Sequence, residues 1–129
     1  MHEAKEGHMS QQSIQLEQVI RNHIAAFNAQ NLYQLLAGFT EDAVWRTGKD
    51  TFRGREEFAQ LFSEAFRTIT PSLTIRSMVI GQDQVACELL ESMTTEGIQR
   101  EDAIAGFYRV DAHGMITSAT IYREGSADV

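Results

Sequence analysis

The main hydrophobic period of the chain changes at Pro71, and this change limits the folds open to it. Before Pro71, apolar residues recur three or four positions apart, which is typical of amphipathic helices. After Pro71, apolar and polar residues alternate over four runs separated by short turns, which is typical of half-buried strands. Because short turns join neighbouring strands as hairpins, these runs predict an antiparallel meander. The sequence therefore predicts an α+β chain whose helices precede most of its sheet.

Three helices and one small hairpin are expected before Pro71. The first helix is expected from Ser13, and the second is capped by Asn31, runs through Phe39 and ends at residues 40–42. The third helix follows Gly54, and residues 43–47 form a hairpin with Phe52. The four later strands are expected at 72–81, 84–95, 98–110 and 115–123.

Composition limits the size, the location and the partners of the protein. Residues 1–12 have no amphipathic period and are expected to be a disordered leader, such as a cloning remnant, before one domain over residues 13–125. A net charge of -7 disfavours nucleic acid and anionic membrane surfaces, and no apolar run is long enough to span a bilayer. Cys87 is the only cysteine, so an intramolecular disulfide is excluded and a cytoplasmic location is the default expectation.

Four segments together resemble one known family. Residues 25–32, 39–45, 52–56 and 107–116 are similar in order and spacing to SnoaL-like and ketosteroid-isomerase-like proteins of the nuclear transport factor 2-like superfamily, over about residues 15–122. The resemblance implies a cystatin-like roll, in which a cone-shaped, curved antiparallel sheet packs on three N-terminal helices and encloses one pocket. Members of the family include isomerases, cyclases, epoxide hydrolases, dehydratases and non-catalytic binding domains, and many dimerise through the outer sheet face.

The catalytic residues of two such enzymes do not carry over to this chain. The tyrosine of the isomerases falls on His23, their carboxylate base on Thr47 and their oxyanion-stabilising acid on Gly106. The His-Trp-Asp run of the cyclases falls on residues 119–121, which contain no acid or base. Neither mechanism is therefore expected in its known form.

Strand parity brings three charged residues together on the expected pocket face. A two-residue turn at 96–97 would place Glu91 opposite Asp102, and a four-residue turn at 111–114 would place Arg123 opposite Asp102. Two carboxylates in one cavity do not ionise together easily, so one of them is a candidate general acid or base, with Asp102 the better base and Arg123 the charge partner. A solvated row of ion pairs that includes Arg100 is the alternative interpretation.

Further candidates concern the lining of the pocket. His23 lies on the apolar stripe of the first helix, where it could donate a hydrogen bond to a ligand oxygen or be a core histidine paired with a hydroxyl. Cys87 is interpreted as a small buried hydrophobe. The other expected lining residues, for which simple core packing is the alternative, are Trp45, Thr47, Phe62, Met93 and Tyr108.

Two functions remain open from the sequence. The favoured one is a non-catalytic pocket or dimerisation domain for a small apolar ligand bearing a carbonyl or hydroxyl. The alternative is a cofactor-independent isomerase, cyclase or dehydratase-type enzyme that uses Asp102 or Glu91 as base, with Arg123 as charge partner and His23 as donor. No metal and no cofactor is expected, because the histidine spacing and the glycine pattern fit neither. An outward row on the last strand predicts a homodimer and comprises Ile116, Ser118, Thr120 and Tyr122.

Overall fold

A computed structural model describes residues 10–124 of the chain, and residues 1–9 of the predicted leader lie outside that range. The helices are α1 (Gln11–Asn28), α2 (Leu32–Ala37) and α3 (Gly54–Thr68). The strands are β1 (Phe39–Thr47), β2 (Asp50–Arg53), β3 (Ser72–Ile80), β4 (Gln84–Thr95), β5 (Ile98–Val110) and β6 (Ile116–Arg123). They form one curved sheet in the order β2-β1-β6-β5-β4-β3, so the predicted α+β class is confirmed.

Side-chain caps and first-turn charges explain where the helices begin. Ser10 Oγ accepts a hydrogen bond from Ser13 N at 3.0 Å, so α1 begins at Gln11, two residues before the predicted start. Asn31 caps α2 as expected, through a 3.1 Å bond from Gln34 N to its Oδ1. In the first turn of α3, Glu57 accepts a bond from the backbone N–H of Arg53, which satisfies a donor that the helix leaves open.

The second helix is shorter than the sequence predicts. It ends at Ala37, and Phe39 is the first residue of β1 rather than part of the helix. The reason is tertiary: Ile116 N donates to Gly38 O at 2.9 Å, and Phe39 pairs with Ile116 in the sheet. Sheet pairing and complete burial of the Phe39 ring therefore outweigh the local helical period.

The sheet is mixed rather than wholly antiparallel. The meander β3 to β6 and the hairpin of β1 with β2 are antiparallel, as expected. However, β1 runs parallel to β6, with Val44 opposite Ser118 and Thr47 opposite Ile121. No tight turn connects these two strands, so the turns of the sequence do not fix their relative direction.

One predicted strand register is found and another is wrong. Glu96 and Gly97 form the turn with φ values of 52° and 81°, as a two-residue hairpin turn requires, and Glu91 lies opposite Asp102. Between β5 and β6 the register shifts near Val110, so Arg123 lies opposite Ile104 and not opposite Asp102. This shift also turns Ile116 inward, where it is buried, so Ile116 does not belong to the outward row.

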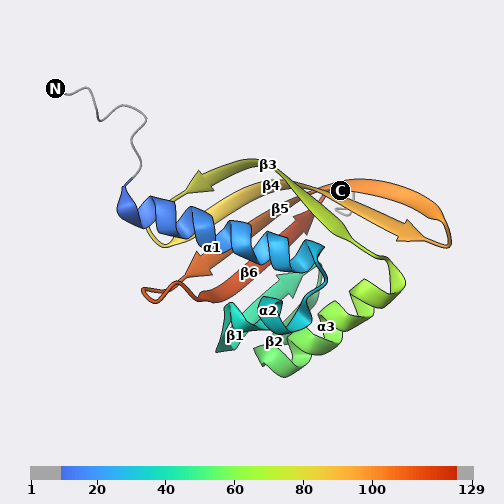
Figure 1. Cartoon of the computed structure of the whole chain (residues 1–129), viewed down its shortest axis with the longest axis horizontal. Coiled ribbons are helices and arrows are strands. Elements are labelled where there is room, and N and C mark those ends of the chain that lie inside the picture. The colour runs from blue at the N-terminus through green and yellow to red at the C-terminus, as the bar shows by residue number, and fades with distance from the viewer. Residues whose placement is uncertain (1–9, 125–129) are drawn as a thin grey trace.

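The helices cover one face of the sheet and create the interior (Figure 1). Helix α1 packs across β3 and β4, whereas α3 packs against β1 and β2. Asn28 fixes the end of α1 to β3, because its side chain accepts from Leu73 N at 2.7 Å and donates to Leu73 O at 2.9 Å. Between residues 10 and 124, no helix is both long and apolar enough to cross a membrane.

Candidate functional site

An apolar pocket of about 210 Å³ lies between α3 and the inner face of the sheet. The end of α1, most of the strands and the segment around Pro71 complete its wall, so residues from nearly the whole chain converge on it. Most lining side chains are apolar, and the charged ones are Glu91 and Arg123. A concave, mainly apolar space with few polar groups is typical of a site for a small organic molecule. We call this space the inner pocket.

Aromatic side chains form much of the wall. Trp45 and Phe62 meet edge to face, with ring centroids 5.1 Å apart, and Tyr108 lies 6.5 Å from Trp45. The structure thus places four of the five expected lining residues at the pocket, because Thr47 lines it too. Met93 is buried but does not line the pocket; its sulfur lies 4.0 Å from Arg100 Nη2.

The three charged candidates form a continuous cluster despite the shifted register. Arg123 donates to Glu91, and its Nη1 lies 3.4 Å from Asp102 Oδ2, because the long side chain reaches past Ile104. Arg100 approaches Asp102 from the other side at 3.5 Å. We call Glu91, Arg123, Asp102 and Arg100 the charged row. Negative and positive side chains alternate along this row, and their formal charges sum to zero.

The charged row leads from the pocket to the surface. The side chain of Glu91 is 8% exposed, Asp102 is 23%, Arg123 is 34% and Arg100 is 70% exposed. Only Glu91 and Arg123 line the inner pocket. The two sequence interpretations therefore each describe one end of the row: a cavity cluster at Glu91 and a solvated ion pair at Arg100.

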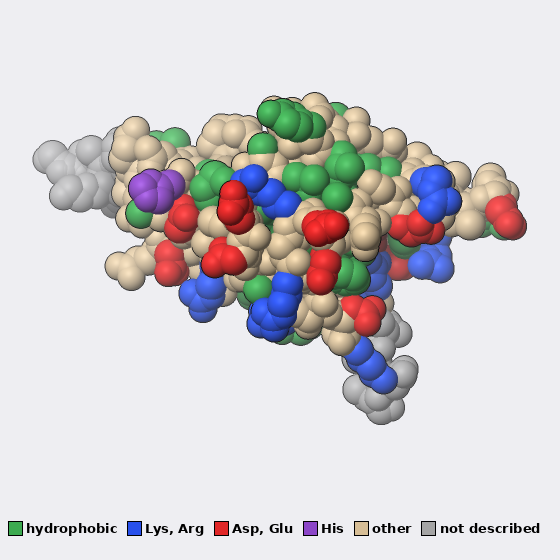
Figure 2. Space-filling model, turned by 90° about the horizontal axis from the view of Figure 1, so that it is seen from below, with side chains coloured by type: hydrophobic (Ala, Val, Ile, Leu, Met, Phe, Trp, Pro, Cys, Tyr) green, Lys and Arg blue, Asp and Glu red, His purple; other side chains and the backbone are tan. Residues whose placement is uncertain are grey.

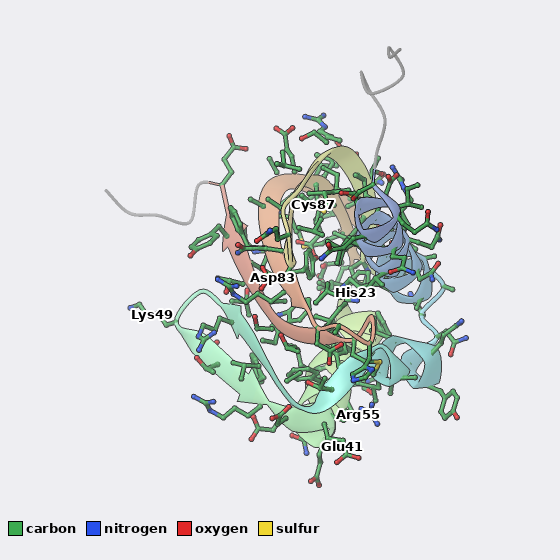
Figure 3. All side chains as sticks on the ribbon, turned by 90° about the vertical axis from the view of Figure 1, so that its left-hand side faces the viewer. His23, Glu41, Lys49, Arg55, Asp83 and Cys87 are labelled. Atoms are coloured by element: carbon green, nitrogen blue, oxygen red, sulfur yellow. The ribbon has the colours of Figure 1, made fainter. Side chains whose placement is uncertain are left out.

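His23 lies behind the aromatic wall and not at the pocket surface. Its ring centroid is 5.3 Å from that of Tyr108 and 6.0 Å from that of Trp45. Figure 3 shows it between α1 and the strands. Neither ring nitrogen has a hydrogen-bond partner among residues 10–124, so the hydroxyl partner that the sequence allowed is not found. Burial lowers the pKa of His23 to about 4, which keeps the imidazole neutral at pH 7.

Burial also determines the chemistry of two neighbouring groups. It raises the pKa of the Cys87 thiol to about 11, so this side chain has little thiolate at neutral pH. Burial likewise raises the pKa of Tyr108 well above its usual range, so its phenol stays protonated. No group of His, Cys, Asp and Glu within residues 10–124 is arranged to hold a metal ion.

A larger hollow of about 480 Å³ lies on the outside, between α1, α2 and the turn before β6. The sequence analysis did not anticipate it. Asn22 and Gln34 border it, and His23 contributes to its floor, but alanine and glycine form much of the remainder. The inner pocket is the better candidate site because it combines aromatic walls with a nearly buried carboxylate. The lining residues that the sequence analysis did not name come from the end of α1, from α3 and the segment after it, and from four strands: Phe27, Leu61, Ala65, Ile69, Pro71, Leu73, Leu89, Ile104 and Ile121. The amphipathic stripe of the third helix was the available signal for Leu61, Ala65 and Ile69.

Three solved structures illustrate what this fold resembles. SalBIII, an epoxide hydrolase/cyclase-like enzyme in pyran ring formation of the polyether salinomycin, has a TM-score of 0.83 at 18% identity, covering 91% of this chain and 96% of that one. RV0760c from Mycobacterium tuberculosis, in complex with estradiol-17beta-hemisuccinate, has a TM-score of 0.76 at 19% identity, covering 84% of this chain and 92% of that one. A hypothetical protein from Catenulispora acidiphila with a ketosteroid isomerase-like fold, in complex with trimethylamine, has a TM-score of 0.74 at 21% identity, covering 81% of this chain and 83% of that one.

Sequence comparison identifies the family directly. None of the curated proteins matches the chain. The SnoaL-like domain, however, matches residues 20–119, which include α2, α3, β1 to β5 and the first half of β6. Every lining residue of the inner pocket except Ile121 and Arg123 lies within this match. The protein belongs to the SnoaL-like domain family.

Proposed function

We propose that the protein binds a small apolar ligand bearing a carbonyl or hydroxyl in the inner pocket, as a non-catalytic binding domain. The observation that carries the proposal is the pocket itself: about 210 Å³ of mainly apolar space with a few polar side chains in its lining. Trp45, Phe62 and Tyr108 would contact the apolar body of the ligand. Thr47 and Arg123 carry the O–H and N–H donors that a carbonyl or hydroxyl oxygen needs.

The structures of similar fold support a ligand-binding role. One holds trimethylamine and another holds estradiol-17beta-hemisuccinate, so related folds accept small molecules of very different size. The inner pocket of this protein is small, and water occupies about 30 Å³ per molecule in the liquid, so it has room for roughly seven waters or a ligand of similar volume. A single six-membered ring with one oxygen is a suitable first probe.

Fluorescence of Trp45, the only tryptophan, tests this proposal directly. Titration with cyclohexanone and cyclohexanol should change its emission saturably. Ala65→Leu, which fills the pocket from α3, should weaken binding about tenfold or more, because the added side chain occupies the ligand space. Ser63→Leu on the exposed side of the same helix is the matched control and should bind as the parent does. Equal effects of the two variants, or no saturable change in the parent, would refute the proposal.

A second candidate function is a cofactor-independent enzyme, and the charged row favours it. Glu91 and Asp102 flank one guanidinium, so one carboxylate could take a proton from water, from a ligand hydroxyl or from a carbon beside a carbonyl. The other carboxyl, starting in its protonated form, would give its proton to the developing oxygen, while Arg123 balances the charge. An isomerase, cyclase or dehydratase-type reaction needs only these groups. His23, the donor that the sequence suggested, lies behind Trp45 and Tyr108 and does not line the pocket. The fold of the epoxide hydrolase/cyclase-like SalBIII supports this reaction class.

Two reactions test the enzymatic candidate. Opening of cyclohexene oxide and deuterium exchange beside the carbonyl of cyclohexanone would each report acid/base chemistry in the pocket. Glu91→Gln and Asp102→Asn should each reduce the rate about 100-fold, the usual contribution of a general acid or base. Glu88→Gln, on the opposite face of β4, is the control and should leave the rate unchanged. If neither reaction is catalysed, or if activity survives in both site variants, the enzymatic candidate is rejected and only the binding role remains.

We also propose that the domain over residues 13–125 forms a cytoplasmic homodimer through its outer sheet face. Phe107 and Tyr122 meet edge to face there, 5.8 Å apart, and Val79 is exposed on the same face. Ser118 and Thr120 complete the patch, whereas the buried Ile116 is not part of it. A contiguous apolar patch on a sheet suits a two-fold contact. The net charge of -7 and the interspersed acidic and basic side chains of Figure 2 disfavour nucleic acid as a partner.

A further inference from the structure

His23 is a buried polar group that the described structure leaves without a partner. Both of its nitrogens lack a hydrogen bond among residues 10–124, although the side chain is almost completely buried. An unpaired buried donor or acceptor lowers stability, and such groups usually pair with water or with a bound molecule. A neutral imidazole offers one donor and one acceptor, so a hydroxyl or a carbonyl oxygen would suit it. His23 also contributes to the floor of the larger outer hollow, but its ring nitrogens are buried there, and Tyr108 and Trp45 lie between it and the inner pocket.

A single layer of aromatic rings separates His23 from the inner pocket. Tyr108 and Trp45 both contact the His23 ring, and both line the pocket. Trp45 is held by further ring contacts with Phe39, Phe58 and Phe62. The described ring contacts of Tyr108 are those with His23 and Trp45. Tyr108 therefore has fewer aromatic neighbours than Trp45, although its side chain is also almost fully buried.

Gly106 determines where the Tyr108 ring lies. The two residues point to the same face of β5, and the ring lies back over Gly106. A Cβ atom at position 106 would be 2.8 Å from Tyr108 Cε2 and 2.9 Å from its hydroxyl oxygen, which is closer than atoms can approach. Glycine at this position therefore creates the space that the ring now occupies. Any side chain there would force the ring out of its present position.

We propose that Gly106 and Tyr108 set the depth of the inner pocket, and that the ligand is a two-ended molecule whose far oxygen reaches His23 when Tyr108 turns. The near oxygen would lie beside Thr47 and Arg123, and an apolar chain or ring would span the aromatic wall between the two ends. This inference rests on the proposed binding function and narrows its ligand class. It assigns specificity to Gly106, a residue that does not itself line the pocket.

Matched pairs of straight-chain ligands test the proposal on the full-length protein. For each chain length, the Kd of an α,ω-diol is compared with that of the 1-alkanol by NMR titration. In the parent, one diol length should bind at least as tightly as its alkanol and should shift the His23 imidazole ¹⁵N signals. In His23→Phe the second hydroxyl loses its partner, so the same diol should bind about tenfold more weakly than in the parent, with the alkanol unchanged.

Gly106→Ala examines the partition itself. Its added methyl group should move the Tyr108 ring into the ligand space, and the diol length preferred by the parent should no longer be preferred. If that variant does not fold, Tyr108→Leu serves instead, and it should move the preferred diol to a different length. If the alkanols bind, and the ratio of the diol Kd to the alkanol Kd is the same in the parent and in His23→Phe, this inference is overturned but the binding function is kept. Absence of binding by both series would overturn the two proposals together.

Discussion

Replacing His23 by phenylalanine should remove a large part of the acid sensitivity of the fold. His23 is buried among the rings of Phe39, Trp45 and Tyr108, and burial lowers its pKa from 6.5 to about 4. Below pH 6.5 the unfolded chain therefore binds a proton at His23 that the folded chain does not bind. Stability from this side chain is complete above pH 6.5 and is lost as the pH falls toward 4.

The expected magnitude follows from the difference between the two pKa values. Lowering a pKa from 6.5 to about 4 corresponds to about 3 kcal/mol in total, of which about 2 kcal/mol would be lost by pH 5. Phenylalanine does not titrate, so His23→Phe should lack this loss. At pH 7.5 the variant should be close to the parent, because removal of two unpaired nitrogens offsets the strain of a larger ring.

Urea unfolding at several pH values between 7.5 and 5, at fixed protein concentration, measures this effect. The carboxylates titrate in both proteins, so the difference between parent and variant isolates His23. His113→Gln, at the exposed turn before β6, is the matched control and should follow the parent. Parallel curves for the parent and His23→Phe would show that the imidazole is hydrated or paired in solution, and the reasoning from burial would be wrong.

Three further predictions concern other parts of the molecule. Arg123→Met leaves Glu91 and Asp102 without their shared cation. Relative to the parent, it should destabilise the fold more at pH 7 than at pH 5, where one carboxyl can take a proton. Urea titrations that show equal losses of unfolding free energy at both pH values would contradict this. Tyr122→Lys places a charge in the apolar outer patch and should shift the mass measured by light scattering from a dimer to a monomer near 14.5 kDa, and an unchanged dimer would exclude that face. Cys87, whose pKa burial raises to about 11, should react with a thiol reagent at pH 8 only after unfolding in urea, and rapid labelling of the native protein would show that the site opens.

The elements were predictable where a local signal determined them. The ends of β4 and β5 and the pairing of Glu91 with Asp102 follow from a two-residue turn that Glu96 and Gly97 can adopt. The position of Arg123 was wrong because the register shift near Val110 has no sequence marker that parity alone can detect. The parallel pairing of β1 with β6 joins segments about 70 residues apart, which no turn connects, so it depends on the complete fold.

The site was predictable in its residue types and less so in its geometry. Trp45, Thr47, Phe62 and Tyr108 reach the pocket because strand parity and a helical stripe fix the direction of their side chains. His23 was correctly placed on the buried side of α1, but its distance behind Tyr108 depends on how the ring lies over Gly106. Met93 has the same parity as Glu91 yet lies beyond the end of the pocket, because parity gives a direction and not a depth.

The pairing of β1 with β6 also has a consequence for how the chain must be assembled. During synthesis, β1 is made about 70 residues, and the end of α3 about 50 residues, before the strand that joins them to the meander. Until β6 is available, the inner edge of β1 has no strand to bind, and the pocket lacks the wall to which Ile121 and Arg123 contribute. Closing so long a loop has an entropy cost that slows the pairing of β1 with β6. The pairing that completes the sheet therefore also completes the ligand site, and both happen late. A ligand present during synthesis would therefore meet a binding site only once the last strand has been added.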